Sequence, residues 1–225
     1  MDKVQIIGVP QSTFVRTVRI AAEEMGIPYD LIPEPPHSPA VDALHPLGRV
    51  PVMRHGDFGL CESRAIITYF EHRFGGSTFI KTDARERARV EQWVSMLITA
   101  MYPVLQGEYL VSYIFPTTPD GTPDRARIEA ALPKVEQHLA VLGEEVTKTG
   151  FLGAESFSIA DAYLIPILFY LSKQPESGAL IEANAALRSY LARHDDRPSV
   201  RATMPENISE EQRERAIKIL SEATA

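Results

Sequence analysis

Two neighbouring hydroxyl side chains stand where the first strand-like run of the chain gives way to a helix-like one. Ser12 and Thr13 follow "KVQIIGV" and precede a stretch with apolar residues at helical spacing. A hydroxyl at this point can cap the helix by accepting a hydrogen bond from a first-turn N–H. It can also hold a reactive group of a bound molecule. The local sequence leaves both roles open.

Two more features downstream could converge with these hydroxyls. Val50-Pro51 precedes a short strand, and a cis bond there would turn the N–H and C=O of Val50 outward, toward an extended peptide-like ligand. Glu62-Ser63 opens a second helix. Ser63 is expected to be its N-cap and, with the first-turn N–H groups, to bind a carboxylate, while Glu62 could pair with an ammonium group. Together Glu62 and Ser63 suit an α-amino acid group.

The elements that must position these residues follow from the periodicity of the first third of the chain. Short β-branched or apolar runs predict strands, a helix spans residues 13–25, and a second helix follows Ser63. Prolines are too dense between Pro33 and Pro46 for regular structure to be expected. The order is βαβ–ββα, which predicts a small α/β domain over residues 1–78. The expected strands are "KVQIIGV", Tyr29–Pro33, Val52–Arg54 and Leu60–Cys61.

The rest of the chain is predicted to be helical. Residues 79–84 are expected to be a linker, and residues 85–225 an all-helical domain that includes a terminal helix over 209–223. Ser158 and Asp161 have the Ser-x-x-Asp spacing of a capping-box variant before a run that is apolar nearly all round. We therefore expect Asp161 to determine the fold of a central, buried helix rather than to act in catalysis.

Composition excludes several classes of function. The 225 residues are 44% hydrophobic and 24% charged with a net charge of −7, so neither nucleic acid nor an anionic membrane is an expected partner. No apolar run approaches the ~20 residues that span a bilayer, and the first residues do not resemble a secretory signal. A single cysteine, Cys61, is expected to be buried and inert in a reducing compartment. The sequence thus predicts a cytoplasmic protein.

Searches for common catalytic and metal-binding motifs are negative. The chain has no GxGxxG after a strand, no GxxxxGK[ST], no GxSxG, no HExxH and no CxxC. Its six histidines show no metal-ligand spacing, so no metal is expected and each is predicted to lie at the surface or in a loop. They are His37, His45, His55, His72, His138 and His194.

The stretch "LGRVPVMRHGDFGLCESRAIITYFEHRFGG" resembles the glutathione-binding segment of cytosolic glutathione transferases. "FSIADAYLIPIL" is similar to the capping-box segment of that family's helical domain, and "GVPQSTFVRTVRIAAEEMGIPYDLI" is similar to its serine-type members, above all the phi class of plant-type or bacterial proteins. The resemblance covers residues 1 to about 200. It implies a thioredoxin-like α/β domain followed by an all-α domain, and a homodimer.

The resemblance also implies roles for individual residues. Ser12, with Thr13 as the alternative, would donate the activating hydroxyl hydrogen bond to the glutathione sulfur. The remaining glutathione contacts would come from Val50 with cis Pro51, from Glu62 and Ser63 at the γ-glutamyl group, and from Arg49 and His37 at a carboxylate.

Glutathione S-transferase activity toward a small hydrophobic electrophile is the function that this resemblance implies. The same site could support dehalogenation, ether cleavage, isomerisation or peroxide reduction, and a non-catalytic binding or interaction protein could keep the fold. Aromatic residues are candidates for walling the electrophile pocket: Phe14, Tyr102, Tyr109, Tyr113 and Phe115.

Overall fold

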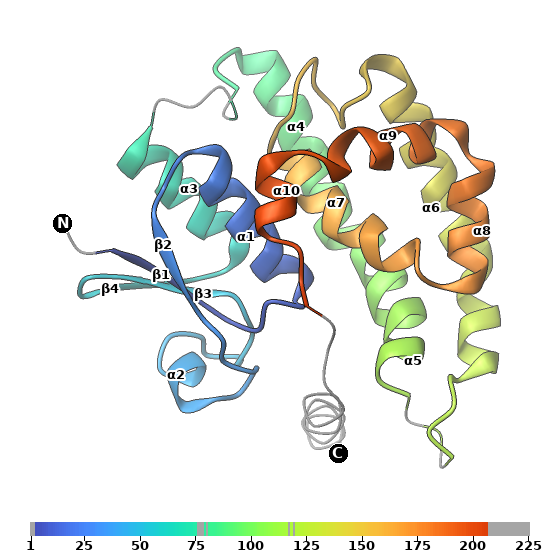
Figure 1. Cartoon of the computed structure of the whole chain (residues 1–225), viewed down its shortest axis with the longest axis horizontal. Helices are drawn as coiled ribbons and strands as arrows, with labels where there is room; N and C mark the ends of the chain where they lie inside the picture. Colours follow the sequence, from blue (N-terminus) through green and yellow to red (C-terminus); the bar gives the residue numbers. More distant parts are fainter. Residues whose placement is uncertain (1–2, 76–78, 80, 117, 119, 207–225) are drawn as a thin grey trace. The chain divides into compact units, whose positions relative to one another are not determined.

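The computed structural model describes residues 3–75, 79, 81–116, 118 and 120–206, and the chain divides into two compact units (Figure 1). The first unit runs to residue 80 and also takes in Arg197 through Glu206, the last described residue. The second unit spans Lys81–Asp196. The division between 80 and 81 falls among the residues expected to be a linker. The expected terminal helix over 209–223 lies outside the described residues.

A four-stranded mixed sheet forms the centre of the first unit. Its strands are β1 (Val4–Ile7), β2 (Tyr29–Ile32), β3 (Val52–His55) and β4 (Phe58–Cys61), in the order β2-β1-β3-β4. β1 and β2 are parallel, whereas β1–β3 and β3–β4 are antiparallel. The predicted strands are thus confirmed.

Helices cover both faces of this sheet. In Figure 1, α1 (Thr13–Glu24) and α3 (Ser63–Phe74) lie on one side of the sheet and α2 (Pro39–Asp42) lies on the other. The expectation of no regular structure between Pro33 and Pro46 is wrong at α2. Ser38 caps this single turn by accepting a hydrogen bond from the Val41 N–H, and Pro39 occupies the first helical position, which needs no N–H donor.

The short helix α10 (Pro198–Ala202) belongs with the first unit, although the sequence assigned everything after residue 85 to the helical domain. Arginines of α1 explain the difference, because they bind the carbonyls in and after α10. Arg16 Nη2 donates to the Val200 carbonyl at 3.3 Å, and Arg19 Nη2 donates to the Ala202 carbonyl at 3.2 Å. Cationic donors near a helix C-terminus satisfy its unpaired carbonyls.

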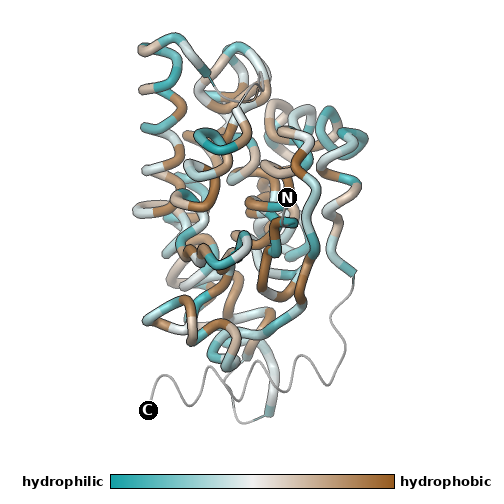
Figure 2. Tube along the Cα trace, turned by 90° about the vertical axis from the view of Figure 1, so that its left-hand side faces the viewer, coloured by the Kyte–Doolittle hydropathy of each residue, from teal (hydrophilic) through white to brown (hydrophobic). Residues whose placement is uncertain are grey.

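The second unit is helical, and the described part of residues 81–196 contains no strand. α4 (Ala84–Met96) continues into two π-helical segments, η1 (Leu97–Met101) and η2 (Pro103–Leu110), and then into α5 (Val111–Ile114). The hydropathy colouring alternates between apolar and polar residues along most helices (Figure 2). The remaining helices are α6 (Arg125–Thr149), α7 (Ile159–Leu171), α8 (Pro175–Ala183) and α9 (Ala185–Asp195).

Asp161 holds the start of the central helix α7, as the sequence predicts. Its fully buried carboxylate accepts hydrogen bonds from the Leu152 N–H at 2.8 Å, the Ser158 N–H at 2.9 Å and the Tyr190 hydroxyl at 2.8 Å. The Ser158 side chain completes the capping box. One carboxylate therefore joins α7, α9 and the preceding loop.

Candidate functional site

One end of the sheet gathers the residues that the sequence singled out. The strand register places Ile32, Ile7, Val52 and Cys61 side by side across the four strands. At this row four connecting segments leave or enter the strands. These segments are Gly8–Ser12 after β1, the loop containing His37 after β2, Val50-Pro51 before β3, and Glu62-Ser63 after β4.

Ser12 is the N-cap of α1. Its Oγ accepts a hydrogen bond from the Val15 N–H at 3.4 Å, a long and therefore weak contact. The side chain is half-buried, and within the described part of the chain its hydroxyl proton has no acceptor. Thr13, by contrast, is only 4% exposed. Of the two residues, Ser12 is therefore the more accessible to a ligand.

Val50 and Pro51 are joined by a cis peptide bond, as the family resemblance implied. The β1–β3 ladder ends at the Ile7–Val52 pair, so Val50 lies outside the sheet. Gly8 brings this segment against the start of α1. A Cβ on Gly8 would lie 2.5 Å from Val15 Cγ2 and 3.0 Å from Val50 Cβ, closer than side chains pack. Only glycine fits here, because its φ of +150° also disfavours other residues.

Glu62 and Ser63 form the start of α3. The N-cap is Glu62, so the expectation that Ser63 caps the helix is wrong by one residue. Glu62 adopts a φ of 70°, which is uncommon outside glycine, and its side chain is 70% exposed. Ser63 is 7% exposed. The strained backbone at Glu62 turns the chain sharply from β4 into α3 and leaves the carboxylate open to a ligand.

His37 and Arg49 both lie at the surface of the loop region between β2 and β3. His37 has a φ of 59°, and its Nδ1 lies 3.7 Å from Asp42 Oδ1. Its ring covers Gly48, where a Cβ would come within 2.1 Å of Nδ1. Both basic residues are exposed on the same stretch of chain, and their contact with a ligand stays a prediction.

The aromatic candidates for an electrophile pocket are divided between the units. Phe14 lies on α1, whereas Tyr102, Tyr109, Tyr113 and Phe115 belong to the second unit, and their joint role stays a prediction. The hydroxyl of Tyr109, a residue with no exposed surface, donates to Glu176 Oε2 at 3.0 Å and accepts from the Ser177 N–H at 3.1 Å. Tyr109 therefore has a structural role in the helical unit.

Glu176 gathers two of these tyrosines and an arginine. Tyr113 also donates to Glu176 Oε2, and Arg125 Nη2 lies 2.8 Å from Glu176 Oε1. Burial opposes ionisation of this carboxyl, but hydrogen bonds from Tyr113 and Arg125 outweigh it and lower the pKa of Glu176 to about 2. The carboxylate is therefore charged at neutral pH and links η2, α5 and α8.

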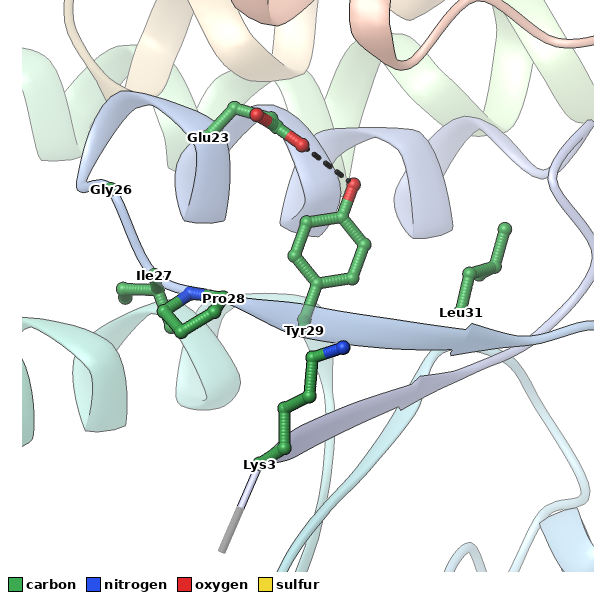
Figure 3. A pocket seen from close by; sticks show the side chains of 7 residues that line it. All are labelled: Lys3, Glu23, Gly26, Ile27, Pro28, Tyr29 and Leu31. Carbon is green, nitrogen blue, oxygen red and sulfur yellow. Dashed lines mark hydrogen bonds between the residues drawn. The ribbon is translucent and has the colours of Figure 1, made fainter. Parts of the chain in front are cut away.

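The hollow shown in Figure 3 lies at the opposite end of the sheet from the candidate site. Tyr29, which lines it, is the first residue of β2 and pairs with Val4, the first residue of β1, whereas the candidate site lies beyond the Ile7–Ile32 pair. The Tyr29 hydroxyl donates to Glu23 Oε1 at 3.0 Å and accepts from Arg19 Nε at 3.2 Å. Burial raises the pKa of Tyr29. The residues that line the hollow are Lys3, Glu23, Gly26, Ile27, Pro28, Tyr29 and Leu31.

Sequence reasoning missed His45 and misjudged two other side chains. His194 is 2% exposed and lies on α9, so the expectation that every histidine lies at the surface or in a loop is wrong for this residue. His45 does lie in a loop, but it is buried, with 3% of its surface exposed. The burial of His45 has no local signal, because its loop is rich in proline and glycine. Cys61, expected to be buried, is half-buried.

The described residues lack two further features. They contain no cluster of three or more histidine, cysteine, aspartate or glutamate side chains that could hold a metal ion. Among the same residues, no helix has the length and apolar character needed to cross a membrane.

Comparison with known proteins gives the same family for both units. The sequence model of the glutathione S-transferase N-terminal domain matches residues 6–78, and that of the C-terminal domain matches residues 125–193. Glutathione S-transferase 1 of Triticum aestivum is 27% identical over 78% of this chain and 82% of its own length. Glutathione S-transferase F7 of Arabidopsis thaliana is 25% identical over 91% of this chain and all of its own.

Two solved structures are similar over nearly the whole chain. Poplar glutathione transferase F1 has a TM-score of 0.80 at 25% identity, covering 96% of this chain and all of its own. A theta-class glutathione S-transferase of Xanthomonas axonopodis pv. citri, solved with glutathione bound, has a TM-score of 0.76 at 25% identity and covers 93% of this chain and all of its own.

Proposed function

This chain belongs to the glutathione S-transferase family and is a glutathione transferase, and from that premise we propose that Ser12 activates the glutathione sulfur. One observation carries the proposal. The half-buried Ser12 hydroxyl lies at the N-terminus of α1 and at the same end of the sheet as Val50 and Glu62, and no acceptor for its proton is found among the described residues.

Glutathione fits this end of the sheet in an extended form. Adjacent strands lie about 4.8 Å apart, so the ends of β1 and β4, two strands apart, are separated by about 10 Å. In an extended glutathione, two residues of chain, about 7 Å, and the cysteine side chain separate the thiol from the γ-glutamyl α-carbon. The thiol would lie at Ser12, the cysteinyl main chain at Val50, and the γ-glutamyl group at Glu62 and Ser63. Glu62 would pair with the ammonium group and the start of α3 with the carboxylate.

The hydroxyl and the helix N-terminus together lower the pKa of the bound thiol. A free thiol titrates near 8.5. A hydrogen bond to a charged group contributes about 1.5–3 kcal/mol, and a helix N-terminus adds about 0.3–1 kcal/mol. At about 1.4 kcal/mol per pKa unit, these contributions lower the pKa by about one to three units. Most of the bound thiol is then thiolate at neutral pH.

The thiolate then attacks the electrophile. The thiol proton leaves to solvent, the sulfur forms a bond to an electrophilic carbon, and a leaving group such as halide departs with its electron pair. The enzyme supplies a nucleophile of lowered pKa held in position. We assign the electrophile to the class of small hydrophobic molecules.

A substrate panel with glutathione tests this function. We expect conjugation of an aryl halide and an isothiocyanate, measured by product absorbance, and retention of the protein on immobilised glutathione. Turnover of only a hydroperoxide or only an alkyl halide would assign peroxide reduction or dehalogenation to the same site. Absence of both retention and turnover would contradict the proposal and indicate a binding module.

We also propose that the protein is a cytoplasmic homodimer. Exposed apolar side chains on the first unit support the dimer, since Leu47, Phe58 and Phe74 are 61%, 44% and 36% exposed. Phe58 and Phe74 both pack against Tyr69, with ring centroids 5.0 and 6.5 Å apart, so part of this surface is one aromatic cluster. Sedimentation velocity should give a mass near twice 25.0 kDa. A mass near 25 kDa at micromolar concentration would contradict the dimer.

A further inference from the structure

His45 is a buried histidine in the loop between α2 and β3, one of the segments that border the candidate site. Its side chain is 3% exposed. Its main chain is fixed on both sides, because its N–H donates to the Val41 carbonyl at 2.8 Å and its carbonyl accepts from the Gly48 N–H at 3.0 Å. The backbone that carries the imidazole is therefore held in place by the loop itself.

The hydrogen bonds of the ring define its tautomer. The Leu47 N–H donates to His45 Nδ1 at 3.0 Å, so Nδ1 must carry a lone pair. In a neutral imidazole the proton is then on Nε2. A donor N–H is thus fixed in orientation by the loop itself.

Nε2 of His45 lies 3.6 Å from Glu62 Oε1, slightly beyond hydrogen-bond length. The Glu62 side chain is 70% exposed, so the carboxylate stays accessible to a ligand beside this imidazole. Glu62 lies at a sharp turn of the backbone, with a φ of 70°. Its side chain makes no capping hydrogen bond to α3, so capping does not orient the carboxylate.

We infer that His45 is a positioning residue that orients Glu62 toward the ammonium group of the γ-glutamyl part of glutathione. The inference rests on the proposed binding mode, in which Glu62 meets that ammonium group. A partner that fixes a ligating side chain in one rotamer raises affinity because less freedom is lost on binding. The electrostatic attraction between the Nε2–H of His45 and the Glu62 carboxylate, whose nearer oxygen is 3.6 Å away, provides this fixation.

The two ring nitrogens separate this role from a purely structural one. In His45→Asn, the side-chain carbonyl can still accept from the Leu47 N–H, but the donor that reaches Glu62 is lost. In His45→Gln, the amide N–H₂ reaches toward Glu62, but the acceptor for Leu47 is displaced. If His45 only stabilises the loop, asparagine should preserve its function better than glutamine. If His45 positions Glu62, glutamine should preserve the affinity for glutathione better than asparagine.

The experiment compares KM for glutathione in the wild type, His45→Asn, His45→Gln and Glu62→Gln. We expect His45→Asn to raise KM about three- to fivefold, which corresponds to about 0.7–1 kcal/mol, and to lower kcat by less. His45→Gln should restore most of the KM despite a lower Tm. With a glutathione analogue that lacks only the γ-glutamyl amino group, the wild type and His45→Asn should have equal KM values.

The possible failures are distinguishable. If Glu62→Gln raises KM for glutathione and His45→Asn does not, the inference about His45 is wrong and the proposed site stands. An equal penalty for His45→Asn with glutathione and with the analogue also contradicts it. If Glu62→Gln leaves the KM for glutathione unchanged, the proposed binding mode itself is wrong, and the inference falls with it.

Discussion

Replacing Ser12 with alanine is expected to lower kcat/KM for conjugation about 10- to 100-fold while glutathione still binds. The change removes a hydroxyl donor to the thiolate, and hydrogen bonds to charged groups contribute about 1.5–3 kcal/mol. The helix start should survive, because the Ser12 cap rests on one long hydrogen bond to the Val15 N–H. Steady-state kinetics with an aryl halide and calorimetric titration with glutathione measure the two quantities.

Thr13→Val is the matched control. It removes a hydroxyl one residue away at nearly constant volume, and Thr13 is too deeply buried to reach a ligand. We expect kcat/KM within twofold of the wild type. A large loss in Thr13→Val with little change in Ser12→Ala would reverse the assignment of the two hydroxyls.

Asp161→Ala is expected to have the largest effect on stability, about 3–5 kcal/mol. The substitution leaves the buried N–H groups of Leu152 and Ser158 and the Tyr190 hydroxyl without their acceptor. Each buried unsatisfied donor costs about 1–3 kcal/mol. For a chain of this size the loss corresponds to a decrease in Tm of roughly 10 °C. Asp195→Ala, at an exposed aspartate in the same unit, should change Tm by about 1 °C or less.

The pH dependence of stability provides a second test of Asp161. Burial raises the pKa of Asp161 to about 6, although hydrogen bonds from Leu152, Tyr190 and Ser158 oppose the shift. An unfolded aspartate titrates near 3.9, so the folded chain holds this proton more tightly. The stability from this group is therefore fully present below about pH 4 and is lost as the pH rises through about 6.

Asp161→Asn should remove this part of the pH profile, because the amide does not titrate. Chemical denaturation at pH 4, 5, 6 and 7 compares the two proteins. A wild-type profile that matches that of Asp161→Asn over this range would show that the buried carboxyl does not titrate with a raised pKa.

The fold of the first unit was predictable because local signals agree with each other. β-branched runs predict strands and apolar residues at helical spacing predict helices, and the structure confirms them. The turn α2 was missed because its prolines argue against a helix, although Pro39 at the first helical position is compatible with one. The placement of α10 could not be predicted, because it depends on Arg16 and Arg19 more than 170 residues earlier in the chain.

Part of the candidate site was also predictable from local sequence signals. Ser12, Val50 and Glu62 each stand at a junction between elements, where a cap, a proline or a helix start can be recognised locally. Gly8 and His45 could not be identified in this way. The close approach of Val15 and Val50 at Gly8 and the contact of His45 with Glu62 exist only after the strands have paired.

Titration of glutathione on the enzyme, followed by thiolate absorbance in the ultraviolet, is the most direct test of the central claim that Ser12 lowers the thiol pKa. On the wild type we predict a pKa about one to three units below the free value near 8.5. On Ser12→Ala at saturating glutathione we predict a return most of the way toward 8.5. The same lowered pKa on both proteins would contradict the claim.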